Sequence, residues 1–154
     1  MGFGSKFKRH FSNAFRELFI YHHSSLEFRA KVFAMIIAAN EAAGECEFDL
    51  VTKAGMEIYN NEDRANTLML TTKEYVQKVH DDNGLDIDRL IQDIIQNLKV
   101  VPRYSKKLDP RQLMPIIECS IDEDTSTYQL RMLDFINSLI QEYSEREKNI
   151  KKRK

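Results

Sequence analysis

Glycine and proline are scarce in this sequence, with 5 and 3 residues among 154. Because these two residues most often interrupt regular structure, their scarcity favours long helices over short strands joined by turns. Cysteine is also rare: Cys46 and Cys119 lie far apart and form no C-x-x-C pair, which indicates neither a zinc site nor a disulfide framework. We therefore expect two free, half-buried thiols in a reducing cytoplasm.

Long apolar runs and catalytic motifs are absent as well. No apolar run approaches the ~20 residues that span a bilayer, and the N-terminus lacks the apolar core and cleavage site of a signal peptide. No nucleophile motif, Gly-rich phosphate loop or H-E-x-x-H helix lies near the 4 histidines. These absences favour a cytoplasmic protein that is not an enzyme and uses no cofactor.

The composition that remains is that of a helical domain. Hydrophobic residues make up 42% and charged residues 31%, as in soluble globular proteins. The spacing of apolar residues predicts an all-α, compact bundle of about seven helices. We expect them near residues 3–21, 24–42, 48–59, 63–80, 86–99, 109–119 and 127–148, with a basic loop over 102–109. The expected organisation is a basic N-terminal helix and linker (1–24), a helical domain (25–145) and a basic tail (146–154).

Charge is distributed unevenly although the net charge is only -1. Residues 1–31 hold six Lys or Arg against two acids, and residues 146–154 hold six against one. The middle of the chain, 32–145, holds eleven bases against twenty-one acids. An acidic body between basic ends is not typical of a nucleic-acid-binding domain. We expect a protein partner, with an anionic membrane surface as the alternative, and leave the oligomeric state open.

The N-terminal segment carries phenylalanines at steps of four, which predicts one aromatic stripe along a helix. Basic side chains cover most of the remaining surface of that helix. Two interpretations stay open: the stripe packs on the core of the domain, or the helix docks on a membrane or in a partner's groove. The candidate docking residues are Phe3, Phe7, Lys8, Arg9, Phe11 and Phe15.

Two acidic corners separate apolar helices in similar ways. The first follows Met35-Ile36-Ile37 and the second follows Met114-Pro115-Ile116, at an offset of 79 or 80 residues. After each corner a new helix begins. The pattern is consistent with a weak internal repeat, and helical patterns also match one another by chance.

With these corners the chain resembles the TerB-like family, which includes tellurite-resistance TerB proteins and a domain of membrane-anchored DnaJ-like co-chaperones. The family pattern is an apolar helix ending in Ala-Asp-Gly, then Ser or Thr, then Glu opening the next helix, in two copies. The resemblance covers about residues 26–145. In the second copy Ile121 stands at the Ala, Asp122 at the Asp, Ser126 at the Ser/Thr and Gln129 at the Glu position.

The first copy departs further from the family pattern. Ala43-Gly44 stands for Asp-Gly, Glu47 replaces the Ser/Thr, and Leu50 replaces the Glu. The resemblance implies a divalent-metal site at the corners, and hard cations need several carboxylate oxygens together. The residues that could rebuild such a cluster are Glu41, Glu45, Asp49, Asp122 and Asp124. The alternative is that these acids cap helices or face solvent.

The resemblance and the charge pattern together suggest a function. We expect a non-enzymatic, cytoplasmic protein-interaction or stress-response module of TerB-like type. The alternatives are a divalent-metal sensor that uses the acidic corners, and a peripheral adaptor at the inner face of the membrane.

Overall fold

The computed structural model describes residues 24–153. Over this range the chain forms six α-helices, one 3-10 helix and no strand, which confirms the predicted all-α bundle. The predicted first helix and its docking residues Phe3, Phe7, Lys8, Arg9, Phe11 and Phe15 lie outside the described residues. The elements are α2 (Ser24–Ala38), α3 (Glu45–Tyr59), α4 (Glu62–His80), α5 (Ile87–Val100), η1 (Pro102–Lys107), α6 (Pro110–Glu118) and α7 (Glu123–Arg153).

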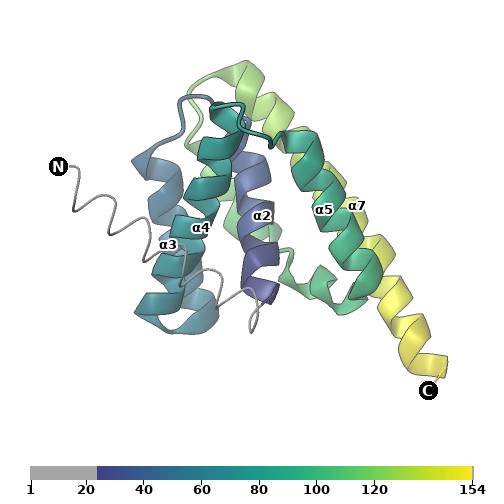
Figure 1. The fold of residues 1–154 in the computed structure, drawn as a ribbon. Helices are drawn as coiled ribbons and strands as arrows, with labels where there is room; N and C mark the ends of the chain where they lie inside the picture. The colour runs from purple at the N-terminus through teal and green to yellow at the C-terminus, as the bar shows by residue number, and fades with distance from the viewer. Residues whose placement is uncertain (1–23, 154) are drawn as a thin grey trace.

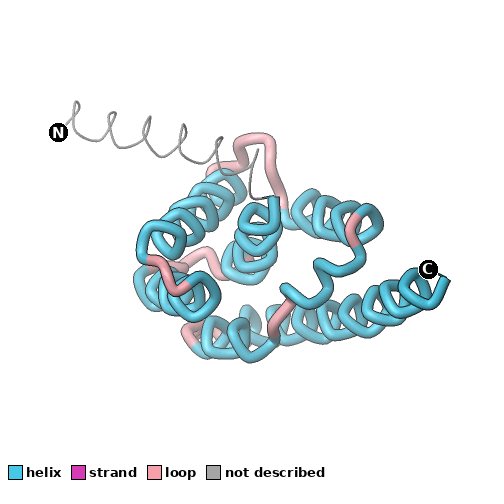
Figure 2. The backbone as a smooth tube through the Cα atoms, turned by 90° about the horizontal axis from the view of Figure 1, so that it is seen from below, coloured by secondary structure: helices cyan, strands magenta, loops and turns pink. Residues whose placement is uncertain are grey.

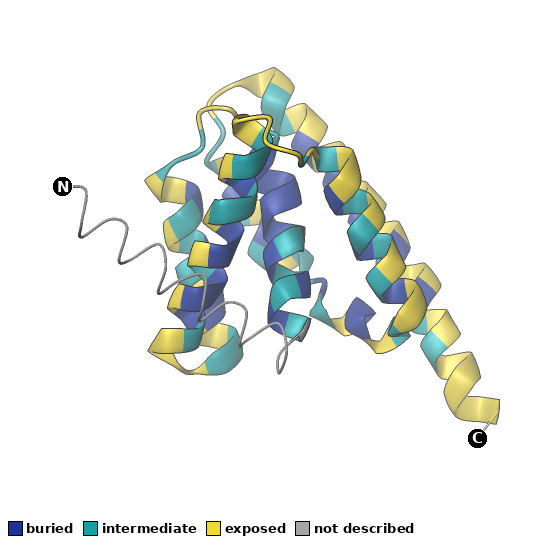
Figure 3. Ribbon diagram, viewed as in Figure 1, coloured by how far each residue is buried: buried dark blue, intermediate teal, exposed yellow. Residues whose placement is uncertain are grey.

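The central element is α2, with α3 and α4 on one side and α5 and α7 on the other (Figure 1). Every residue from Val32 to Ala38 is buried, and Figure 3 shows this helix as the darkest part of the bundle. A helix that is apolar on all sides must be surrounded by other elements, which confirms the predicted central position. The helix ends at Ala38, four residues before the predicted end, because residues 39–44 form a turn.

Local capping sets several helix starts. Asp86 accepts a hydrogen bond from the Arg89 amide at 2.8 Å, and Asp109 accepts one from the Arg111 amide at 3.0 Å. A side-chain oxygen at the N-cap satisfies an amide that lacks a helical partner. α3 begins at Glu45, three residues earlier than predicted.

Two predictions in the second half of the chain are wrong. Residues 102–107 form a 3-10 helix and no open loop, because Tyr104 is buried and its ring packs 5.1 Å from that of Phe28. α7 begins at Glu123 and not near 127, since Asp122 accepts hydrogen bonds from the amide and the hydroxyl of Thr125. It also continues to Arg153, past the predicted end at 148.

The last turns of α7 are held by η1. Glu147 lies 3.2 Å from the Nζ of Lys106, and also 3.2 Å from the Nζ of Lys151 one turn further along α7. These hydrogen bonds, above all the one from Lys151, lower the pKa of Glu147. Beyond this point α7 extends away from the bundle, as the view from below shows (Figure 2).

Candidate functional site: the disulfide and the acidic end

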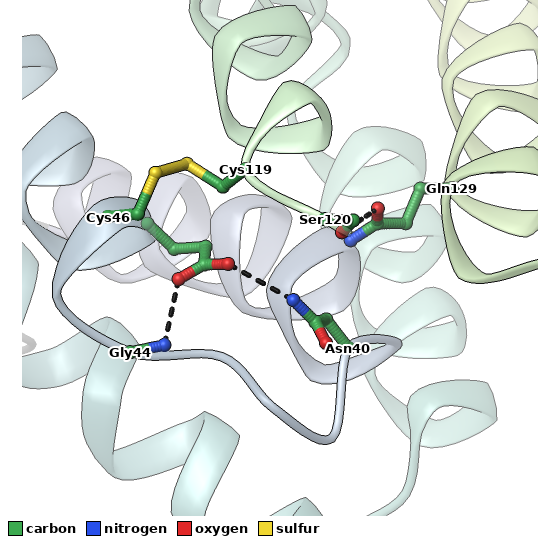
Figure 4. Close-up of a disulfide and its surroundings, with 7 residues drawn as sticks. Asn40, Gly44, Cys46, Cys119, Ser120 and Gln129 are labelled. Carbon is green, nitrogen blue, oxygen red and sulfur yellow. Dashed lines mark hydrogen bonds between the residues drawn. A yellow bond between two sulfur atoms is a disulfide. The ribbon is translucent and has the colours of Figure 1, made fainter. Parts of the chain in front are cut away.

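Cys46 and Cys119 form a disulfide, with Cα atoms 6.0 Å apart (Figure 4). The expectation of two free thiols is therefore wrong. Cys46 is the second residue of α3 and Cys119 directly follows α6, so the packing of α3 against α6 brings them together. They are 73 residues apart in sequence, and such a spacing alone contains no sign of this contact.

The first corner, residues 39–44, is organised by a buried carboxylate. Glu47 is only 3% exposed, and its Oε2 accepts a hydrogen bond from the Gly44 amide at 2.7 Å. Its Oε1 accepts one from the side-chain amide of Asn40 at 3.1 Å. A buried carboxylate needs such donors, and the N-terminal end of α3 adds a favourable dipole. Glu47 therefore holds the corner together and starts α3 early.

The second corner, residues 119–122, is organised by a buried amide. Gln129 is 0% exposed; its Oε1 accepts from the Ser120 hydroxyl at 2.7 Å, and its Nε2 donates to the Ile36 carbonyl at 2.9 Å. The Nε2 of His80 likewise donates to the Ala38 carbonyl at 3.0 Å. The last carbonyls of a helix lack partners within it. Side chains of α7 and α4 thus donate hydrogen bonds to carbonyl groups in the last turn of α2.

The two corners are built in similar ways. Asn40 and Ser120 each lie two residues after the end of a helix, and they are 80 residues apart. Each is hydrogen-bonded to a buried polar side chain of the next helix, Glu47 in one case and Gln129 in the other. This likeness matches the predicted offset between the corners.

The five candidate metal ligands do not converge. Glu41, Glu45 and Asp49 are exposed around the start of α3, whereas Asp122 and Asp124 are exposed at the start of α7. Asp122 caps α7, and the hydroxyl and amide of Thr125 lower its pKa by donating hydrogen bonds to the ionised form. Among residues 24–153, no group of three or more His, Cys, Asp or Glu side chains is placed to hold a metal ion.

The corners instead form one strongly acidic end of the bundle. The helices alternate in direction, so residues 39–44, 81–86 and 119–122 all lie at the same end (Figure 1). The stretches 39–49, 81–88 and 118–124 each contain four Asp or Glu and no Lys or Arg. We call this region the acidic end; its negative potential favours cationic ligands and partners.

A groove between α3 and α4 opens at the acidic end. It encloses about 400 Å³, and we call it the α3–α4 groove. Its apolar lining includes Phe48, Met69 and Val76, and its acidic lining includes Glu45 and Asp49. The other lining residues are Ala43, Gly44, Thr52, Lys73, Gln77 and His80.

A second hollow lies on the other side of the end of α4. It encloses about 510 Å³ and shares His80 with the α3–α4 groove. Val79, Ile87 and Tyr128 contribute apolar surface, and Glu41 adds a carboxylate. Apolar recesses and negative charge are therefore combined at one end of the molecule.

The opposite end of the bundle carries clustered cations. Burial lowers the pKa of Lys107, and the positive charges of Arg29 and Arg103 lower it further. Burial likewise lowers the pKa of Arg29, whose guanidinium lies 5.7 Å from the centre of the Tyr59 ring. The described chain therefore has two electrostatically different ends.

Sequence reasoning missed the residues that shape this site, although one signal was present. Gln129 precedes Met132, Leu133 and Ile136 by three, four and seven residues, which places it on the buried stripe of α7. A polar residue on such a stripe predicts a buried hydrogen bond. The partners Ile36 and Ser120 depend on how distant helices pack, and the sequence does not indicate them.

Comparison with known proteins assigns neither a family nor a function. No protein-family model, curated protein or solved structure matches the chain.

Proposed function

We propose that the chain is a non-enzymatic protein-interaction module whose acidic end binds a basic amphipathic helix of a partner protein. The observation that carries this proposal is the α3–α4 groove itself, an apolar recess of about 400 Å³ within an acidic surface. Grooves of this kind accept the apolar face of an amphipathic helix. The module acts through contacts, and no reaction is assigned to it.

The lining of the groove defines the chemistry of its occupant. Phe48 and Met69, both half-buried, offer apolar surface to large aliphatic or aromatic side chains. The Nζ of Lys73 lies 5.7 Å from the centre of the Phe48 ring, so an occupant that reaches this ring has to displace the lysine. Glu45 and Asp49 are exposed on the α3 side and would attract Lys or Arg on the edge of a bound helix. Charges on the rim mainly raise the association rate and set selectivity, while burial of apolar surface supplies most of the affinity.

The sequence of this chain provides a suitable probe. A synthetic peptide of residues 1–21 combines phenylalanines at steps of four with lysines and arginines. Its binding would be measured by fluorescence anisotropy against the full chain and against a chain beginning at Ser24 that circular dichroism shows to be folded. We expect binding that weakens with salt, as electrostatic steering implies. Binding to the shortened chain alone would mean that the chain's own segment occupies the groove.

Matched charge reversals test the location of binding. Asp49→Lys changes an exposed acid that lines the groove, whereas Glu57→Lys makes the same change on α3 outside it. We expect about a ten-fold loss of affinity for Asp49→Lys and less than about two-fold for Glu57→Lys. Equal effects of the two variants, or no peptide binding to either chain, would rule out the proposed groove function.

The other expectations about function stay predictions. They are the TerB-like assignment with its stress-response role, the cytoplasmic location and the membrane-adaptor alternative. Among the described helices, none combines the length and apolarity that a bilayer crossing requires. The disulfide weighs against the cytosol, because disulfides persist mainly in oxidising compartments. Sedimentation with anionic liposomes, with and without residues 1–23, would test the membrane alternative.

A further inference from the structure

The disulfide is accessible from solvent. Cys46 is exposed at the start of α3, and Cys119 is half-buried at the end of α6. The chain has 2 cysteines in all, so no other thiol within it can exchange with this pair. An exposed disulfide is the kind that a small thiol can attack, whereas a buried one is protected.

Further along the two helices, solvent reaches between α3 and α6. A hollow of about 160 Å³ opens to the surface there, lined by residues that include Leu50, Ala54 and Pro115. At the acidic end the disulfide is the covalent link between the first turn of α3 and the end of α6.

The same turn of α3 forms one wall of the α3–α4 groove. Gly44, Glu45 and Phe48 line the groove, and Glu45 directly precedes Cys46 in sequence. When the disulfide is open, Glu47 still joins this turn to Gly44 and Asn40, both within the first corner. The covalent tie from this turn to the second corner is then lost.

We propose that Cys46–Cys119 is a reversible redox site that controls the first turn of α3 and, through it, the affinity of the α3–α4 groove. The statement about affinity rests on the proposed function, whereas the statement about the turn does not. The oxidised form is the one that binds tightly.

The reaction is a two-electron thiol–disulfide exchange. A thiolate of a dithiol attacks the Sγ of Cys46, the more exposed of the two residues, forming a mixed disulfide and releasing Cys119 as a thiolate that takes up a proton. The second thiol of the reductant then displaces Cys46. The products are two cysteine thiols and the cyclic disulfide of the reductant, so that atoms and electrons balance.

Backbone hydrogen exchange on the full chain tests control of the turn. The amides of Phe48 and Ser120 report on the two corners, and the amide of Leu90 in α5 is the reference at the same end. With dithiothreitol we expect about ten-fold faster exchange at Phe48 and Ser120 and no change at Leu90. Alkylation and mass measurement would confirm that both thiols are free.

The double variant Cys46→Ser, Cys119→Ser is the matched control. It should behave like the reduced protein and show no response to dithiothreitol. Unchanged exchange on reduction would overturn the proposal. Global unfolding of the reduced chain would overturn it as well, because the disulfide would then be a requirement for folding and not a switch.

Peptide affinity tests the second half of the proposal. The peptide of residues 1–21 should bind the reduced form and the double-serine variant about ten-fold more weakly than the oxidised form. Equal affinity would refute control of the groove. Binding to neither form would refute the proposed function and the affinity claim together, while hydrogen exchange would still decide whether the disulfide controls the corner.

Discussion

At the scale of single residues, the fold depends on a few buried polar side chains. Glu47 and Gln129 each serve a corner, and both are hydrogen-bonded through their two side-chain polar atoms. Burying such a group without its hydrogen-bond partners costs several kcal/mol of folding free energy. The surrounding donors and acceptors therefore determine which polar side chain can be buried at the position. Gln129 both accepts and donates, and an ionised carboxylate at this position could not donate to the Ile36 carbonyl.

Gln129→Glu should therefore destabilise the protein at pH 7 by about 3 kcal/mol. Burial would raise the pKa of the new carboxyl above the ordinary Glu value of about 4.3. Because the protonated acid can donate a hydrogen bond, the loss should be small near pH 4 and grow as the pH rises through the raised pKa. Urea unfolding at several pH values measures this dependence.

Gln129→Met serves as the control, since it has similar size and cannot titrate. The difference in free energy of unfolding between Gln129→Met and the wild type should be the same at every pH. A Gln129→Glu cost that is likewise independent of pH would contradict the hydrogen-bond geometry given for the second corner.

Some residue roles could be predicted from the sequence because they are local. Asp86 and Asp109 cap helices by accepting hydrogen bonds from amides only two or three residues away, so these roles depend on local sequence. The bond between Gln129 and Ile36 joins residues 93 apart, and only the packing of α7 against α2 creates it. A role could thus be predicted when the two partners lie close together in sequence, and could not when they lie far apart.

At the scale of elements, α3 and α4 pack unusually closely. A Cβ atom added to Gly55 would lie 2.8 Å from the Cα of Ala65 and 3.0 Å from its Cβ. Both atoms are fixed to the helix backbone, so α4 as a whole would have to move. The same two helices form the walls of the α3–α4 groove nearer the acidic end.

Gly55→Ala should lower the free energy of unfolding by about 2 kcal/mol, even though alanine normally favours a helix over glycine by about 1 kcal/mol. Gly44→Ala is the control, because nothing lies within 4 Å of the added Cβ and the φ there, -157°, is negative. We expect the control to change stability by less than about 1 kcal/mol. Urea titration compares the two variants, and equal costs would contradict the close approach of α3 and α4.

The existence of each described α-helix was predictable, and several of their ends were not. Apolar periodicity marks a helix wherever one face is buried. The end of α2 and the starts of α3 and α7 depend on Asn40, Glu47 and Asp122, whose hydrogen bonds decide where the turn stops. The 3-10 helix over Pro102–Lys107 escaped prediction because it is short and held by the burial of Tyr104.

At the scale of the whole molecule, the acidic end surrounds the disulfide. Glu45 precedes Cys46, and Glu118 precedes Cys119. Negative charge repels an anionic thiolate and lowers its local concentration, whereas a cationic thiol is attracted. The acidic charge was visible in the sequence as two corners, but its convergence at one end follows from the alternating helix directions.

Reduction by cysteamine should therefore be several-fold faster than reduction by 3-mercaptopropionate, after correction for the thiolate fraction of each reagent. Adding salt to ~0.5 M should largely remove the difference by screening. Rates would be followed by quenching with an alkylating reagent and counting adducts by mass. Equal rates at low salt would show that the neighbouring carboxylates do not act on the disulfide.

The disulfide also determines which parts of the chain a pulling force can extend. It closes a covalent ring that joins residues 73 apart in sequence, while α2 and α7 both lie outside the ring on two arms. A force applied between the two termini would extend the arms but could not stretch the ring. At about 3.4 Å per residue, roughly 250 Å of contour length would stay hidden until the disulfide is reduced. Pulled from its ends, the oxidised molecule is therefore a much shorter tether than its sequence length suggests.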